Sequence, residues 1–229
     1  QSINKKKIYF YLLILIFLST TFNFSIISKL NNLNQITNIN IEGLSEKEKN
    51  NIKNELNVFM NQSIFFIDKN SIMNSLDIFN FIENFLIQKV LPSKLIISAK
   101  KTKFLGLTIL NGEKFYIGAN GRLTSVSQVE NENNLPIVFG NFSINDFLNL
   151  QNVFENSKID SKNIKKYLYH KSKRWDLIDQ NNITIMLPSK NIETALKNYK
   201  TLIENKKTNL VNIIDLRIYD KIILTFDEE

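Results

Sequence analysis

An uninterrupted apolar run extends from Ile8 to Ile27 and contains no charged residue. A helix rises about 1.5 Å per residue, so about 20 apolar residues are needed to cross a hydrocarbon core of about 30 Å. The run has that length, and it directly follows three cations, Lys5, Lys6 and Lys7. Positive charge on this flank favours a cytoplasmic N-terminus. The pattern predicts a cytoplasmic tail (1–7), a transmembrane helix (8–27) and a body outside the cytoplasm.

The large apolar side chains of this helix are expected to contact lipid. They are Ile8, Phe10, Leu12, Leu13, Ile14, Leu15, Ile16, Phe17 and Leu18. A cleaved signal peptide is the alternative, but its apolar core has only about 7 to 15 residues and ends at a small-residue cleavage site. Phe24, Ile26 and Ile27 occupy the place of such a site, which favours a retained anchor.

After a polar linker (28–35), residues 36–102 show the order strand, helix, helix, strand, strand. Ile36–Glu42 alternates between apolar and polar positions, and Ser45 with Glu48 forms a capping box before an apolar helical stripe. Asp68 is a candidate cap for the second helix. Two further strands are separated at Leu91–Lys94, where Pro92 cannot donate to a ladder. The pattern predicts two helices on a three-stranded sheet.

Residues 103–229 change to short strands and turns, and we expect a mixed, β-rich domain. An Asn120-Gly121 pair predicts a hairpin turn between two strands. Helices are predicted over Phe147–Phe154 and Ile159–Leu168, and a longer one after Pro188-Ser189. Strands are predicted over Trp175–Ile178, Ile183–Leu187, Val211–Tyr219 and Ile222–Phe226. The whole chain is therefore expected to be α+β.

Charge and cysteine content exclude several classes of function. The net charge of +7 includes the three lysines beside the apolar run, and the other charges of both signs are scattered, so we predict no nucleic-acid binding. The chain contains no cysteine, which excludes disulfides and cysteine-based metal sites. Stability must come from packing.

Candidate catalytic chemistry is weak. His170 is the sole histidine, and we expect it to be a tolerated surface residue because it has no cysteine or second histidine as a partner. Asp176 and Asp179 are a possible acid–base pair, but no phosphate-binding loop or other motif supports them. We predict that the protein is not an enzyme and uses no cofactor or metal.

The order of motifs along almost the whole chain resembles the FtsQ/DivIB family of bacterial division proteins. The motifs follow the basic tail and anchor. They are Ile41-Glu42-Gly43, Ile87–Ile97 with Pro92 at its centre, Tyr116–Arg122, Leu135-Pro136 followed by Gly140, Arg174-Trp175-Asp176-Leu177, Leu187-Pro188 and Ile214-Asp215-Leu216-Arg217. Gln88, Lys101, Phe104 and Gly118 depart from the family pattern, which puts individual salt bridges in doubt.

The resemblance implies a POTRA domain (36–102) and a β-domain (103–229) on the periplasmic side of the inner membrane. It implies a scaffold at the division septum that recruits FtsB and FtsL, with upstream division proteins at the POTRA edge. Partner binding would fall on Arg217, Ile218, Tyr219, Ile222, Leu224 and Phe226. A POTRA-bearing translocation or assembly module that binds client strands is the alternative, and an envelope hydrolase is a third.

The last predicted strand has two interpretations on its residues alone. With only three acidic residues following it, its free backbone edge can accept a strand from another chain. Alternatively, Ile222, Leu224 and Phe226 are inward core residues and the acidic tail prevents unwanted pairing. Trp175 is expected in the core with Leu177 and Ile185, and Arg174 and Arg217 are expected either to pair with Asp176 or Asp215 or to contact a partner.

Overall fold

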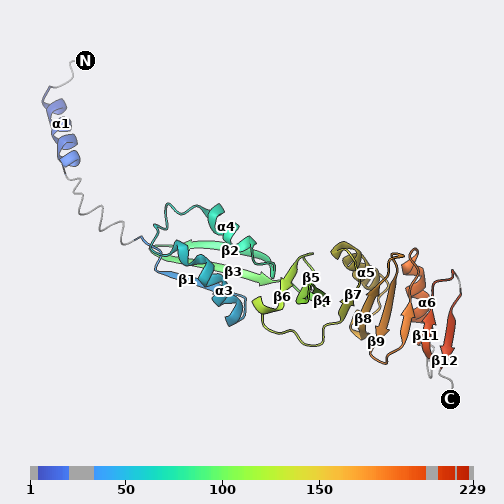
Figure 1. Ribbon diagram of the computed structural model, residues 1–229. Coiled ribbons are helices and arrows are strands. Elements are labelled where there is room, and N and C mark those ends of the chain that lie inside the picture. The colour runs from blue at the N-terminus through green and yellow to red at the C-terminus, as the bar shows by residue number, and fades with distance from the viewer. Residues whose placement is uncertain (1–4, 21–33, 205–210, 220, 227–229) are drawn as a thin grey trace. The chain divides into compact units, whose positions relative to one another are not determined.

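The structure is a computed structural model that describes residues 5–20, 34–204, 211–219 and 221–226 (Figure 1). The predicted anchor begins in helix α1 (Lys5–Thr20), which has 16 residues. No helix in these described ranges has both the length and the apolar character needed to cross a membrane. Residues 21–27 of the predicted span and 28–33 of the predicted linker lie outside the described residues, so the anchor stays a prediction.

The chain divides into two compact units. The first contains Gln1–Leu44, Lys49–Ile78 and Asn84–Ala99, and the second contains Ser45–Glu48, Phe79–Glu83 and Lys100–Glu229. The expected α+β class is confirmed, because both helices and sheets are present.

A three-stranded sheet and two helices follow α1 in the predicted order. The elements are β1 (Asn38–Glu42), α3 (Glu46–Leu56), η1 (Asn57–Phe59), α4 (Lys69–Asp77), β2 (Ile82–Val90) and β3 (Lys94–Lys101). The strand order is β1-β3-β2, so β1 is an edge strand as expected. The predicted capping interactions are present, since Asp68 accepts from the Asn70 backbone and Glu48 accepts from Ser45 N at 3.0 Å.

Nine strands of the second unit form one mixed sheet in the order β12-β11-β10-β9-β8-β7-β4-β5-β6. The strands are β4 (Phe104–Leu110), β5 (Glu113–Gly118), β6 (Leu123–Ser125), β7 (Ile137–Phe139), β8 (Ile164–Tyr169), β9 (Trp175–Asp179), β10 (Thr184–Met186), β11 (Val211–Asp215) and β12 (Ile223–Phe226). The helices are η2 (Val126–Gln128), α5 (Ile144–Asn156), η3 (Ser161–Asn163) and α6 (Ile192–Glu204). The predicted hairpin is β5–β6, with Gly121 at φ +76° in its turn.

The predicted helix over Ile159–Leu168 is wrong, because the second half of this segment belongs to strand β8 and the first half contains only the short 3-10 helix η3. Ile164 and Tyr167 are both buried, and their spacing of three imitates a helical stripe. The β8–β9 register shifts between Ile164 and Lys166, as in a β-bulge. A bulge adds one residue to a strand, so two inward-facing residues can lie three positions apart. The last long strand is also shorter than predicted, since β11 ends at Asp215.

One hydrophobic core joins α5 and α6 to this sheet. Phe147, Leu150 and Phe154 of α5 and Leu196 and Tyr199 of α6 belong to the same buried cluster. Trp175 is 3% exposed within it, and Leu177 and Ile185 are fully buried, so the predicted core position of Trp175 is confirmed. Two helices on one face leave the other face of an antiparallel-rich sheet to solvent, which matches the alternation along β10, where buried Ile185 lies between half-buried Thr184 and Met186.

An ion-pair cluster in the second unit accounts for Lys101, one of the departures from the family pattern. Its Nζ lies 2.8 Å from Glu48 Oε1 and 2.8 Å from Glu132 Oε1. The Glu48 side chain is 1% exposed, whereas that of Glu132 is 42% exposed. Burial opposes ionisation of Glu48, but Lys101 and the Ser45 backbone N–H outweigh it and lower the pKa of Glu48 below its ordinary value of 4.5.

Glu48→Gln should destabilise the second unit by about 1–3 kcal/mol at pH 7, because a buried hydrogen-bonded charge is lost. Because the pKa of Glu48 is lower in the folded state than in the unfolded state, its ionised carboxylate stabilises the fold at pH values above the unfolded-state pKa. This stabilisation is lost as the pH falls through the folded-state pKa. The gap between variant and wild type should therefore shrink below about pH 4. Urea unfolding at pH 7 and pH 3 measures it.

Glu132→Gln is the matched control, since it removes the exposed carboxylate on the same lysine. Exposed pairs contribute only about 0–1 kcal/mol, so it should have a small effect at both pH values. A Glu48→Gln loss that is equal at pH 7 and pH 3 would contradict the assignment of stability to the ionised carboxylate.

Candidate partner-binding surface

Strand β12 forms one edge of the nine-stranded sheet and pairs only with β11 among the described strands. The pairing is antiparallel, with Leu224 opposite Ile214 and Phe226 opposite Val211. An edge strand presents a row of unpaired backbone N–H and C=O groups on its free side. The predicted strand edge is therefore present in the structure.

The side chains of β12 include one that packs in the core and one that is exposed, as partner binding would require. Val211 and Ile214 are 3% and 0% exposed, so their partners Phe226 and Leu224 extend the core-facing side of the sheet. Leu224 packs against the core and is half-buried. Phe226, in contrast, is 53% exposed, because no further strand lies beside it in the described part of the sheet. The core-facing side thus ends in an uncovered apolar border.

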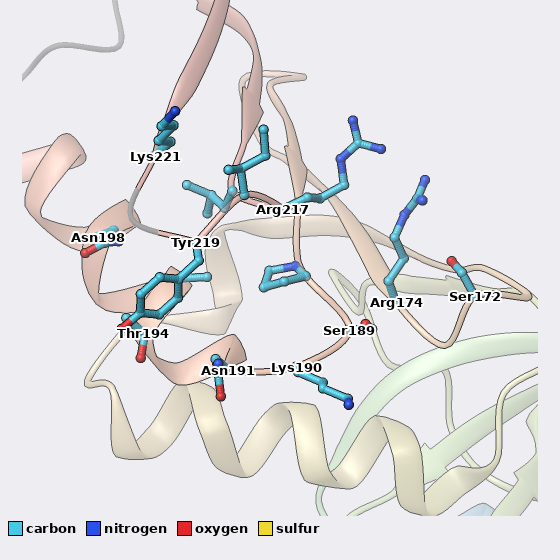
Figure 2. A pocket seen from close by; sticks show the side chains of 14 residues that line it. Ser172, Arg174, Ser189, Lys190, Asn191, Thr194, Asn198, Arg217, Tyr219 and Lys221 are labelled. Carbon is cyan, nitrogen blue, oxygen red and sulfur yellow. The ribbon is translucent and has the colours of Figure 1, made fainter.

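A pocket of about 390 Å³ lies at the loop that leads into β12 (Figure 2). Three segments that are distant in sequence form it: the turn between β8 and β9, the start of α6, and the loop between β11 and β12. The lining residues used below are Arg174, Lys190, Thr194, Arg217, Tyr219 and Lys221. Tyr219 is 69% exposed and lies beside Thr194 in Figure 2, so a large aromatic surface faces the opening.

Two arginines of the pocket are positioned by carboxylates of the adjacent strands. Arg217 donates to both oxygens of Asp215, at 2.8 Å from Nε and 2.6 Å from Nη2. These hydrogen bonds lower the pKa of the Asp215 carboxyl below its ordinary value. Arg174 Nε lies 3.5 Å from Asp176 Oδ1. The expected arginine–aspartate pairs are therefore present, and both guanidinium groups extend to the same side of the pocket in Figure 2.

The pocket has a positive lining. Lys190 and Lys221 accompany the two arginines, and none of its described lining residues is acidic. Arginine presents a planar set of donors that suits carboxylates, and it stays charged at any physiological pH. The arrangement suits an acidic segment of a partner better than a neutral or basic one.

The candidate catalytic residues have structural roles. His170 Nε2 lies 2.7 Å from Asp176 Oδ2, so the prediction that His170 is only a tolerated surface residue is wrong. Asp179 accepts from the backbone of Asn181 and Ile183 at 2.9 and 2.8 Å and thereby shapes the β9–β10 turn. Within the described ranges, no group of three or more acidic or histidine residues is placed to hold a metal.

The structure places the six predicted partner-binding residues in two neighbouring groups. Arg217, Ile218 and Tyr219 line the pocket, while Leu224 and Phe226 lie on β12, and Ile222 directly precedes it. The sequence did not identify the contribution of the segment around the start of α6, where Thr194 lies in the helix and Lys190 lies two residues before it begins at Ile192. The helix start at Pro188-Ser189 was recognisable, but its proximity to the β11–β12 loop arises from the parallel pairing of β10 with β11.

Comparison with known proteins agrees with the motif order. Residues 108–217 match the family described as cell division protein FtsQ/DivIB, C-terminal. No curated protein matches the sequence. A solved structure of the major extracytoplasmic domain of the cell division protein DivIB (trans isomer) from Geobacillus stearothermophilus is 10% identical and covers 48% of this chain and 98% of that chain. Its TM-score of 0.35 is too low to carry an argument. On this match and the motifs within it, residues 108–217 belong to the FtsQ/DivIB family of cell division proteins as its C-terminal domain.

Proposed function

We propose that this protein is a membrane-anchored scaffold of the division septum that captures FtsB and FtsL-like partners through β12 and the adjacent pocket. The observation that carries the proposal is the uncovered apolar border of β12, where Phe226 is 53% exposed on the core-facing side of the sheet. A strand from a partner would complete the backbone hydrogen bonds of the edge and cover this border.

Affinity and specificity would come from different parts of this surface. Backbone pairing along β12 is largely independent of sequence, whereas side chains choose the partner. Burial of apolar area contributes about 25 cal/mol per Å², so covering Phe226 favours an apolar residue in the partner strand. Arg174 and Arg217 favour a carboxylate next to that strand.

The membrane topology belongs to the same proposal. The lysines before the apolar run favour a cytoplasmic N-terminus and a single pass through the inner membrane, with both compact units in the periplasm. The first unit would be the POTRA domain, and its edge strand β1 would offer a second surface to upstream division proteins.

Affinity purification of the full-length chain from detergent-solubilised membranes of dividing bacteria tests the proposal. We expect stoichiometric recovery of a small coiled-coil membrane protein pair of the FtsB and FtsL type, and a septal position for a fluorescent fusion. Recovery of many outer-membrane proteins would instead favour the assembly module that binds client strands. Turnover of purified cell wall by the isolated protein would favour the hydrolase.

A further inference from the structure

Three segments of the first unit meet at the end where the chain enters it. Ile64 N donates to Asn34 O at 2.8 Å, and Thr37 N donates to Ser93 O at 3.0 Å. Lys89 Nζ donates to Ile67 O at 2.8 Å. These bonds join the entering chain to the turn before α4 (63–67) and to the β2–β3 hairpin (90–93). We call this end of the unit the entry tip.

The entry tip exposes four large apolar side chains from two of these segments. Phe66 is 86% exposed and Phe65 is 55% exposed in the turn, while Leu91 and Val90 are 59% and 40% exposed in the hairpin. Scattered single apolar residues are normal on a protein surface, but four large ones, two of them aromatic, on two segments that the Lys89–Ile67 hydrogen bond joins mark a contact site.

The turn 63–67 keeps the side chains of Phe65 and Phe66 exposed to solvent. Ile64 and Ile67 on either side of them are 0% and 7% exposed and fix the turn to the core. Backbone bonds to Ser63 O from Phe66 N at 3.2 Å and from Ile67 N at 3.1 Å close the turn. Phe65 and Phe66 therefore cannot turn into the core without breaking these contacts.

Three lysines lie in or beside the segments of the entry tip. Lys69 begins α4, Lys89 lies at the end of β2 and Lys94 begins β3. Lys69 and Lys89 are exposed and Lys94 is half-buried. Aromatic rings next to lysines are the combination that binds the headgroup region of a bilayer, where rings enter the interface and cations face anionic lipids.

From this we infer that the entry tip rests in the headgroup region of the membrane, with Phe65 and Phe66 inserted. The inference rests on the anchor in the proposed function. Between the end of the predicted span at Ile27 and Asn34, where the described chain resumes, an extended chain spans at most about 25 Å. The tip is the part of the unit that this short tether would bring to the bilayer, and its chemistry fits that surface.

Single-cysteine labelling of the full-length chain tests this inference, because the sequence contains no native cysteine. Phe66→Cys would be labelled with the fluorophore NBD after reconstitution into phosphatidylglycerol-containing vesicles. Ile78→Cys is the matched control, since Ile78 is apolar and 54% exposed but follows α4, which leads away from the tip. We expect a nitroxide lipid labelled near the headgroup to quench NBD at position 66 several-fold more than at position 78.

Vesicle flotation of both labelled proteins tests the membrane anchor separately from the contact of the entry tip with lipid. Protein that floats but shows equal quenching at positions 66 and 78 would overturn the entry-tip contact and leave the anchor intact. Protein that does not float would overturn both. A label at position 66 that is shielded from aqueous iodide but not reached by the lipid quencher would show that a protein surface covers the tip, which also overturns the lipid assignment. Phe65→Cys provides a second site if labelling at position 66 disturbs folding.

Discussion

Trp175→Ala is expected to destabilise the second compact unit by about 3–5 kcal/mol, the range for removing a large aromatic ring from a packed core. The Trp175 ring lies 4.6 Å from the Tyr169 ring centroid, 5.7 Å from Phe142, 6.0 Å from Phe147 and 6.3 Å from Tyr167. With the indole removed, strand β9 loses its ring contact with Phe147 of α5, and a cavity remains among the surrounding rings. Urea unfolding followed by far-UV circular dichroism measures the loss.

Tyr219→Ala is the control for this variant, because Tyr219 is an aromatic residue of the same unit that is 69% exposed. Surface substitutions usually change stability by less than about 0.5 kcal/mol. If the two variants unfolded at the same urea concentration as the wild type, the aromatic cluster would not be the core that the structure shows.

Phe226→Asp is expected to abolish partner capture while the protein stays folded. Its side chain is 53% exposed, so the carboxylate remains solvated in the free protein. In the proposed complex the same charge would be buried against an apolar partner strand, at a cost of several kcal/mol. Since each 1.4 kcal/mol is about tenfold in affinity, we expect a loss of more than about a hundredfold. Recovery of FtsB and FtsL-like proteins with the full-length chain measures it.

Thr225→Asp is the matched control on the same strand, because its side chain points to the opposite face of the sheet. It adds the same charge without disturbing the apolar border, and much of the partner recovery should remain. Unchanged recovery with Phe226→Asp would contradict the proposed surface. An unfolded Phe226→Asp protein would show that Phe226 is a core residue and contradict it as well.

Local signals predicted much of the fold. The capping residues Ser45 and Asp68, the Asn120-Gly121 turn and the apolar stripe of α6 each act within a few residues, and the structure contains all of these features. The error over residues 159–168 has a physical cause, because the bulge in β8 gives a strand the spacing of a helix.

The candidate site was less predictable, because it depends on contacts between distant segments. The sequence suggested the edge strand and the two arginines. It could not show that the β8–β9 turn and the start of α6 join the β11–β12 loop around one pocket, since this follows from strand order. The bond between His170 and Asp176 was missed because two residues six positions apart gave no periodic signal.

Site-specific photocrosslinking in dividing cells tests the central claim most directly, because the sheet has two described edges that can be compared in one protein. A benzophenone amino acid would be placed at Thr225 on β12 or at Ser125 on β6. The account predicts a crosslink to a small coiled-coil membrane protein of the FtsB type from position 225 and none from position 125. Crosslinking from position 125 alone, or equally from both edges, would contradict it.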